Sequence, residues 1–369
     1  MTTIINQQPN DPQTYDRQKE VNEFDETKLG VKGLVDSGIS QIPRIFHHPP
    51  ENQISIPDLN SDSDSDSIPV IDLLGTPREE ALEKVREASK KYGFFQIVNH
   101  GVPVSLLHRL VDAIKAFHEQ PAEVRREYYS RGMGSGCNYF SNVDLFVSKA
   151  ASWRDTLSIR LGPSIVDVEA IPAICREEVV EWNKEVEQLG ELLLGLFSEG
   201  LGLSVDRLKE LSCLENRVMV GHYYPYCPEP DKTVGIASHA DPGVFTILLQ
   251  DQVGGLQVKH GDNWINVKPI PGALVINVGD LLQILSNGKY TSVDHRVYAN
   301  PLQEPRVSIA VFFNPGSREH TYGPLPELVS PEEPALYQEF TITEFLNRFF
   351  TKELDGKSLV NYFRLKSEG

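Results

Sequence analysis

A series of short β-rich segments between residues 217 and 313 constrains the fold of this chain more than any other feature. The segments are rich in Val, Ile, Phe and Tyr, and Gly, Pro, Asn or Asp residues separate them. They cover 217–224, 244–251, 255–259, 264–267, 272–278, 292–298 and 306–313. Short strands at such close spacing are typical of a sandwich or barrel. We therefore predict a β-barrel in the C-terminal half of the chain.

The N-terminal half has a different pattern, because helical periodicity dominates it. Apolar residues recur at helical spacing over 173–200, and a second helix is predicted near 103–117. Short strands are predicted at 68–75 and 94–101. The fold class is therefore α+β with a mainly β core.

Four regions are expected from these patterns. They are an N-terminal extension with an acidic linker (1–67), a helical region (68–210), the barrel (211–320) and a helical tail (321–369). The linker contains "SDSDSDS" at 61–67, whose alternating charges leave no apolar face. A solvated linker is the simplest interpretation, and a phosphorylation site is the alternative.

Charge and composition exclude several classes of protein. The formal net charge is −17, whereas binding to nucleic acid or to an anionic membrane needs clustered Lys and Arg. No apolar run approaches the length of a membrane span, and the N-terminus lacks a signal-peptide pattern. Four widely spaced cysteines indicate reduced thiols. We expect a cytoplasmic monomer whose partner is a small molecule.

Three polar residues in or beside the β-rich segments suggest a metal site. His239 and Asp241 precede an apolar run at 244–249, and residues i and i+2 of an extended chain share a face. His295 lies in a later β-rich segment and offers a third ligand. Two imidazoles and one carboxylate form the facial triad of non-haem Fe(II) oxygenases. Zinc would accept the same ligands, and the spacing also arises by chance, so the motif alone leaves the metal open.

A second pair of polar residues interrupts the apolar segment 306–313. Arg306 and Ser308 are again i and i+2, and a buried arginine needs an anionic partner. A ligand carboxylate would pair with the planar guanidinium through two hydrogen bonds, and Ser308 would add a third. Tyr224, on the segment that enters the barrel, has a hydroxyl that can reach the same carboxylate. Core packing is the alternative for Tyr224.

These motifs together resemble those of the plant soluble 2-oxoglutarate- and Fe(II)-dependent dioxygenases. The resemblance covers about 24–365 and includes "GFFQIVNHG", "ASWRDTL" and "HYYPYCP". The segment "FDETKLGVKGLVDSGISQIPRIF" at 24–46 is similar to the branch of 1-aminocyclopropane-1-carboxylate oxidase homologues, which includes desacetoxyvindoline 4-hydroxylase-like enzymes. The resemblance implies a double-stranded β-helix, or jelly roll, with flanking N-terminal helices.

The resemblance also implies the cofactors and the roles of the residues that match. His239, Asp241 and His295 would bind Fe(II). Arg306, Ser308 and Tyr224 would hold the distal carboxylate of the co-substrate 2-oxoglutarate. O2 would be the oxidant and ascorbate a reductant. The reaction would oxidise a C–H bond of a small hydrophobic plant metabolite and release succinate and CO2.

The chain departs from the family pattern at His222, where many relatives carry an asparagine that orders the co-substrate. The imidazole either replaces that hydrogen bond or points away. Candidate substrate contacts are Phe312 and Asn314 beyond Ser308, together with aromatic residues of a lid at 138–155. The lid residues are Tyr139, Phe140, Phe146 and Trp153, for which ordinary packing is the alternative.

Two alternative functions would differ in their need for these motifs. A true 1-aminocyclopropane-1-carboxylate oxidase would keep the iron triad and use ascorbate in place of 2-oxoglutarate. A metal-free protein that senses a hormone or metabolite would need neither motif. The long N-terminal extension disfavours the oxidase, and the complete set of ligands disfavours the sensor.

Overall fold

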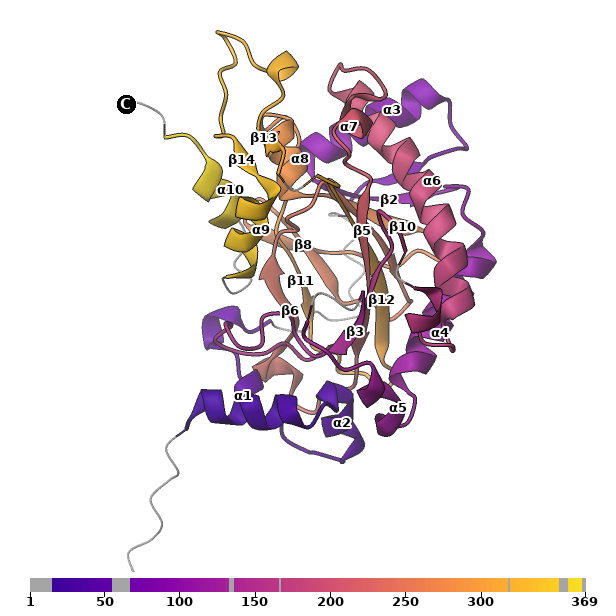
Figure 1. The fold of residues 1–369 in the computed structure, drawn as a ribbon, viewed down its shortest axis with the longest axis vertical. Helices are drawn as coiled ribbons and strands as arrows, with labels where there is room; N and C mark the ends of the chain where they lie inside the picture. The colour runs from indigo at the N-terminus through magenta and orange to yellow at the C-terminus, as the bar shows by residue number, and fades with distance from the viewer. Residues whose placement is uncertain are drawn as a thin grey trace, which may run out of the picture.

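Two facing β-sheets form the centre of the molecule in the computed structural model (Figure 1). The structure describes residues 15–54, 67–132, 136–165, 167–317, 319–351 and 358–366. The larger sheet has the strand order β1-β2-β10-β7-β12-β5-β4-β3, and the smaller sheet has the order β6-β11-β8-β9. The predicted jelly roll with flanking helices is confirmed. Most of the Ser/Asp run lies outside the described residues.

The strands and helices have the following bounds. The larger sheet contains β1 (Val70–Asp72), β2 (Phe94–Val98), β3 (Cys137–Phe140), β4 (Asp155–Arg160), β5 (Asn216–Tyr224), β7 (Phe245–Gln250), β10 (Leu274–Val278) and β12 (Arg306–Asn314). The smaller sheet contains β6 (Val234–His239), β8 (Leu256–His260), β9 (Asn263–Asn266) and β11 (His295–Tyr298), and β13 (Thr321–Tyr322) pairs with β14 (Phe340–Thr341). The helices are α1 (Arg17–Glu26), α2 (Gly30–Asp36), α3 (Arg78–Lys91), α4 (Val104–His118), α5 (Ala122–Glu127), α6 (Arg176–Gly200), α7 (Arg207–Glu210), α8 (Asp280–Leu285), α9 (Ile342–Phe350) and α10 (Ser358–Phe363).

The alternation of side chains along β12 separates the main core from the interior of the jelly roll. Val307, Ile309 and Val311 belong to the large apolar cluster beneath α3, α4 and α6. Arg306 and Ser308 lie on the opposite face of the strand, as the period of two requires. One strand thus anchors the helical layer and presents polar groups toward the smaller sheet.

Helix α6 packs closely on the larger sheet, and a glycine permits the approach. A Cβ at Gly190 would lie 2.5 Å from the ring of Phe313, which stacks on Phe245 with ring centroids 4.3 Å apart. Burial of such aromatic pairs contributes strongly to core stability. The helical layer therefore holds β7 and β12 in fixed positions behind the site.

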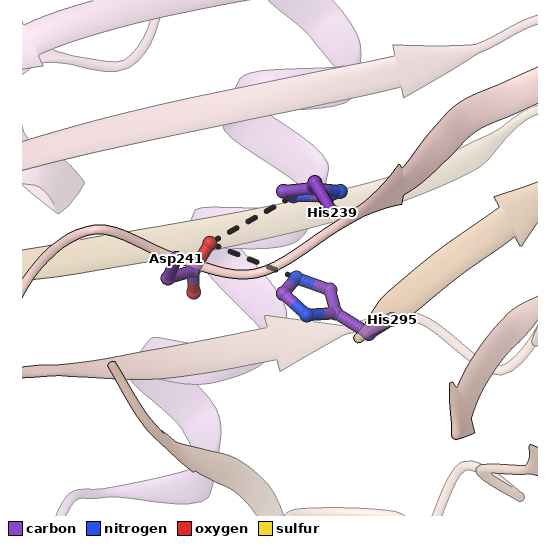
Figure 2. A group of neighbouring side chains, drawn as sticks. All are labelled: His239, Asp241 and His295. Carbon is purple, nitrogen blue, oxygen red and sulfur yellow. Dashed lines mark ion pairs between the residues drawn. The ribbon is translucent and has the colours of Figure 1, made fainter. Parts of the chain in front are cut away.

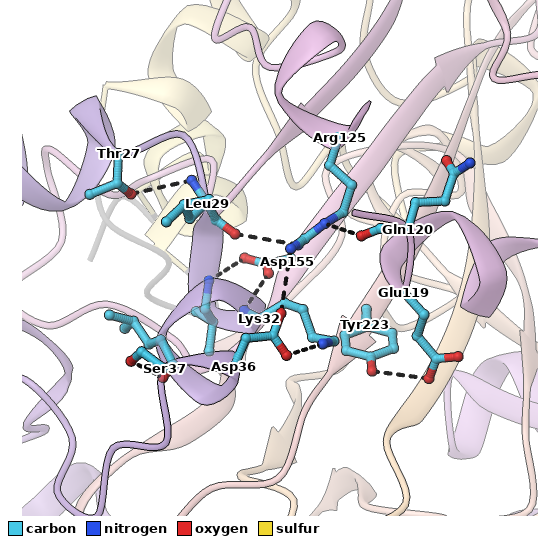
Figure 3. A network of polar contacts seen from close by, with 12 residues as sticks. Thr27, Leu29, Lys32, Asp36, Ser37, Glu119, Gln120, Arg125, Asp155 and Tyr223 are labelled. Carbon is cyan, nitrogen blue, oxygen red and sulfur yellow. Dashed lines mark hydrogen bonds and ion pairs between the residues drawn. The ribbon is translucent and has the colours of Figure 1, made fainter. Parts of the chain in front are cut away.

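The N-terminal extension is attached to β4 through a buried carboxylate (Figure 3). Asp155 accepts hydrogen bonds from the backbone N–H groups of Val31 and Lys32, each at 2.8 Å. Gly30 has φ +69°, and a Cβ there would lie 2.4 Å from the Asp155 Oδ1 atom. Trp153 also faces the extension and packs on Phe46, with ring centroids 4.9 Å apart. Residues 153 and 155 therefore point away from the interior of the jelly roll.

No helix in the described part of the chain has both the length and the apolar character that a bilayer span requires.

Candidate metal and co-substrate site

His239, Asp241 and His295 meet in the interior between the two sheets (Figure 2). Strands β6 and β11 pair so that His239 lies directly opposite His295, and their ring centroids are 4.2 Å apart. The Nε2 atoms of the two imidazoles lie 3.7 Å and 3.6 Å from Oδ1 of Asp241. All three side chains are buried. The predicted triad therefore converges on one point.

Hydrogen bonds on the far side of each imidazole fix its tautomer. Nδ1 of His239 donates to the carbonyl oxygen of Ala237 at 2.8 Å, and Nδ1 of His295 donates to that of Val293 at 3.4 Å. Because a carbonyl oxygen only accepts, the proton sits on Nδ1 and the lone pair on Nε2. Burial, together with the neighbouring His295, lowers the pKa of His239 to about 3. His239 is therefore neutral at physiological pH, which is the state that binds a metal.

Asp241 is oriented in the same way by two donors behind it. Its Oδ2 atom accepts hydrogen bonds from Thr246 at 2.6 Å and from Asn277 at 2.7 Å. Burial alone would raise the pKa of Asp241, but the two imidazoles and these hydrogen bonds hold it below its usual value. The carboxylate is thus ionised and leaves Oδ1 for a metal.

The donor set fits Fe(II). Two neutral imidazole nitrogens and one carboxylate oxygen are ligands that ferrous iron accepts, and they approach from one side. Each ligand has a hydrogen-bonding partner that orients it, as is usual in metal sites. Among the described residues, no other group of three His, Cys, Asp or Glu side chains is placed to hold a metal.

We expect Thr246→Val to weaken metal binding by about 10- to 100-fold, because Asp241 loses one of its two orienting donors. Valine keeps the shape of the side chain, so the strand should remain intact. Titration calorimetry with Mn(II) in place of Fe(II) measures the change. Thr343→Val in α9, an exposed threonine, serves as the control. Equal Mn(II) affinity in both variants would contradict the orienting role.

A buried arginine with an incomplete set of partners lies at the start of β12, on the face of the strand that points into the jelly roll. Arg306 is 2% exposed; its Nη1 donates to Ser308 Oγ at 3.0 Å and its Nη2 to Gln250 Oε1 at 3.1 Å. Its Nε atom has no hydrogen-bond partner, and the structure records no ion pair for it among the described residues. The ring of Tyr224 lies 4.9 Å from the guanidinium carbon. A buried cation in this state can accept a carboxylate from a ligand.

His222 faces the interior instead of pointing away. The register places it between Ser308 of β12 and Thr156 of β4, and its Nδ1 lies 3.0 Å from the Thr156 hydroxyl. Burial, followed by the charges of Arg154 and Arg306, holds the pKa of His222 well below its usual value. The ring is therefore a neutral hydrogen-bonding group on the inner face of the larger sheet.

The candidate substrate residues fall on different faces. Phe312 lies on the inner face of β12 opposite Thr246, and Phe140 of β3 pairs with Thr156 on that same face.

Tyr139 has the opposite orientation: it is fully buried in the main core, and its hydroxyl donates to Asp155 and the Leu29 carbonyl. The side chain of Phe146 is 41% exposed. The guanidinium carbon of Arg131 lies over its ring, 5.2 Å from the centroid. Asn314 ends β12.

Three polar residues of the site were not predicted from the sequence. Thr246, Gln250 and Asn277 each interrupt or end an apolar strand, and this is the signal that was available. Their partners lie far along the chain, so only the fold shows that they bind Asp241 and Arg306.

Comparison with known proteins agrees with the geometry of the site. The sequence model of the 2OG-Fe(II) oxygenase superfamily matches residues 215–315. The model described as the N-terminal region of non-haem dioxygenases in morphine synthesis matches residues 68–170.

Curated relatives extend over nearly the whole chain. It is 47% identical to 1-aminocyclopropane-1-carboxylate oxidase homolog 1 of Arabidopsis thaliana, over 95% of this chain and 97% of that protein. It is 44% identical to deacetoxyvindoline 4-hydroxylase of Catharanthus roseus, over 95% of this chain and 90% of the relative.

Solved structures show the same fold. JOX2 in complex with 2OG, Fe and JA superimposes with a TM-score of 0.81 at 33% identity, over 91% of this chain and 98% of the other. The rice dioxygenase for auxin oxidation gives a TM-score of 0.68 at 28% identity, over 81% of this chain and 100% of the other.

Proposed function

Because this chain belongs to the plant 2-oxoglutarate- and Fe(II)-dependent dioxygenases, in the branch of the 1-aminocyclopropane-1-carboxylate oxidase homologues, we propose that it oxidises a C–H bond of a small hydrophobic plant metabolite. Fe(II) is held by His239, Asp241 and His295, and 2-oxoglutarate is the co-substrate. Hydroxylation consumes one O2 and one 2-oxoglutarate and yields one hydroxylated product, one succinate and one CO2.

The observation that carries the proposal is the buried guanidinium of Arg306, which has no ion pair among the described residues and lies in the same jelly roll as the oriented triad. We assign Arg306, Ser308 and Tyr224 to the distal carboxylate of 2-oxoglutarate. The free Nε atom of Arg306 and the free amide nitrogen of Gln250 supply donors that the protein itself leaves unused. A dicarboxylic co-substrate anchored there would have its other end directed toward the triad.

The chain's own residues prepare the site before any reaction. The carbonyls of Ala237 and Val293 keep each Nε2 unprotonated, and Thr246 and Asn277 keep Asp241 ionised and in place. When bound, Fe(II) supplies the activation of O2 that couples oxidation of the substrate to decarboxylation of the co-substrate. The protein supplies orientation and exclusion of water, which its buried interior favours.

The substrate pocket is proposed on the inner face of the larger sheet. Phe312 and Phe140 offer aromatic walls there, with Asn314 at the end of β12. Phe146 remains a candidate for the lid. Tyr139 contributes indirectly, because its hydroxyl belongs to the network that holds the N-terminal extension. The relative deacetoxyvindoline 4-hydroxylase supports hydroxylation as the reaction.

The same proposal places the enzyme in the cytoplasm as a monomer. The cytoplasmic location rests on the four widely spaced cysteines, which indicate reduced thiols. Light scattering on the purified protein tests the monomer.

The function is tested with the purified protein, Fe(II), ascorbate, 2-oxoglutarate and a plant extract. We expect at least one metabolite to gain one oxygen by mass spectrometry, with succinate formed in a 1:1 ratio to product. Omission of 2-oxoglutarate should abolish both signals. Ethylene release from 1-aminocyclopropane-1-carboxylate without 2-oxoglutarate would identify the oxidase activity instead.

A further inference from the structure

Arg154, just before β4, is a buried arginine with no counter-charge in the described part of the chain. It is 3% exposed, and its Nε and Nη1 atoms have no hydrogen-bond partner among those same residues. Burial of an unpaired guanidinium is costly, so native proteins pair nearly all of them. The cost at this position therefore calls for an explanation.

The other buried arginines in the described part of the chain do have partners. Arg125 donates to the carbonyls of Gln120 and Leu29 and to the Tyr139 hydroxyl. Arg217 donates to the Leu214 carbonyl and pairs with Glu187. Arg306 has two partners and an assigned ligand. Arg154 is the exception among the four.

The alternation of the strand directs Arg154 into the jelly roll. Trp153 and Asp155, on either side of it, both face the N-terminal extension, and Figure 3 shows Asp155 engaged there. The intervening side chain points the other way, toward the face on which Thr156 contacts His222. The charge of Arg154 accordingly contributes to the low pKa of His222, after burial itself.

The position differs from that of the proposed co-substrate anchor. Arg306 of β12 lies opposite Tyr224 of the neighbouring strand β5, and β4 is the next strand beyond β5. Two strand spacings separate the backbones at β12 and β4 by about 10 Å. Arg154 is therefore available to a second ligand while Arg306 holds 2-oxoglutarate.

We propose that Arg154 binds a carboxylate of the organic substrate, so that the natural substrate is a small hydrophobic acid. This inference rests on the proposed oxygenase function and specifies its substrate class. Nε and Nη1 each keep an N–H without a partner among the described residues, and either can donate a charge-assisted hydrogen bond to a carboxylate oxygen. The carboxylate would complete the hydrogen bonds that the protein leaves open, and it would fix which carbon of the substrate faces the metal.

The test compares matched acids and esters. The probes are a panel of aryl- and alkyl-substituted carboxylic acids, each paired with its methyl ester. Binding to the full-length protein, loaded with Mn(II) and saturated with 2-oxoglutarate, is measured by calorimetry. We expect the acids that bind to do so about 10- to 100-fold more tightly than their esters, as one charge-assisted pair provides. Arg154→Gln should remove that preference and leave the Kd of 2-oxoglutarate unchanged.

Two controls separate charge from folding. Arg154→Lys keeps the charge and much of the volume, and it should retain part of the preference for acids. Arg160→Gln, at the exposed end of the same strand, should behave as wild type. The inference is overturned if no acid in the panel binds more tightly than its ester, or if the preference survives in Arg154→Gln. Failure of the oxygenase function would appear differently, as absent 2-oxoglutarate binding in the wild-type protein.

Discussion

Asp241→Ala should abolish 2-oxoglutarate turnover and leave the protein folded. The substitution removes the only anionic ligand of the triad, and loss of a mere orienting partner already costs about 10- to 100-fold in metal affinity. We therefore expect at least about 100-fold weaker metal binding. Thr246 and Asn277 would each lose an acceptor, at about 1–3 kcal/mol per group, which is smaller than the stability of an ordinary domain.

Three measurements check this expectation. Calorimetry gives Mn(II) affinity, succinate formation gives turnover, and thermal unfolding followed by circular dichroism reports the fold. Asp262→Ala, an exposed aspartate between β8 and β9, is the matched control and should retain full activity. Turnover in Asp241→Ala at the wild-type rate would remove Asp241 from the metal site.

The parts of the site that follow from local geometry could be predicted from the sequence. The pairs His239/Asp241 and Arg306/Ser308 are two residues apart, and an extended backbone places such residues on one face whatever the rest of the fold does. An Arg in an apolar strand also signals a buried charge that needs a partner. Both pairs were accordingly identified from spacing and polarity.

The parts that depend on strand pairing could not be predicted. The alignment of His239 with His295 is set by the β6–β11 register, which joins segments far apart in the chain. The strands β3 and β4 were not predicted, because they lie in a region where helical patterns dominate the sequence. They nevertheless form one edge of the larger sheet. A shift of one residue in register reverses every side chain. Aromatic content alone therefore could not show that Tyr139 and Phe140 face opposite sides.

Arg154 illustrates the same limit. Its segment "ASWRDTL" resembles that of the family, but nothing in the segment shows which face the arginine takes. Only the contacts of Trp153 with Phe46, and of Asp155 with the start of α2, establish the alternation. The burial that makes the charge costly is also a property of the fold and not of the segment.

Arg306→Lys should raise the concentration of 2-oxoglutarate needed for half-maximal turnover by about 10- to 100-fold. Hydrogen bonds to charged groups contribute about 1.5–3 kcal/mol each, and tenfold corresponds to about 1.4 kcal/mol. An ammonium group keeps the positive charge but lacks the planar fork. It therefore cannot bind Ser308, Gln250 and a carboxylate in the present arrangement.

The measurement separates binding of the co-substrate from binding of the metal. Calorimetric titration with 2-oxoglutarate should show the loss, while Mn(II) affinity should change less than twofold because Arg306 contacts none of the three ligands. Arg296→Lys on β11 is the control, since that guanidinium binds Gln257 and lies 3.9 Å from the ring centroid of Trp264. An unchanged 2-oxoglutarate affinity in Arg306→Lys would exclude Arg306 as the anchor. The buried guanidinium of Arg154 would then be the next candidate for the co-substrate, and the inference of an acidic substrate would need a different residue.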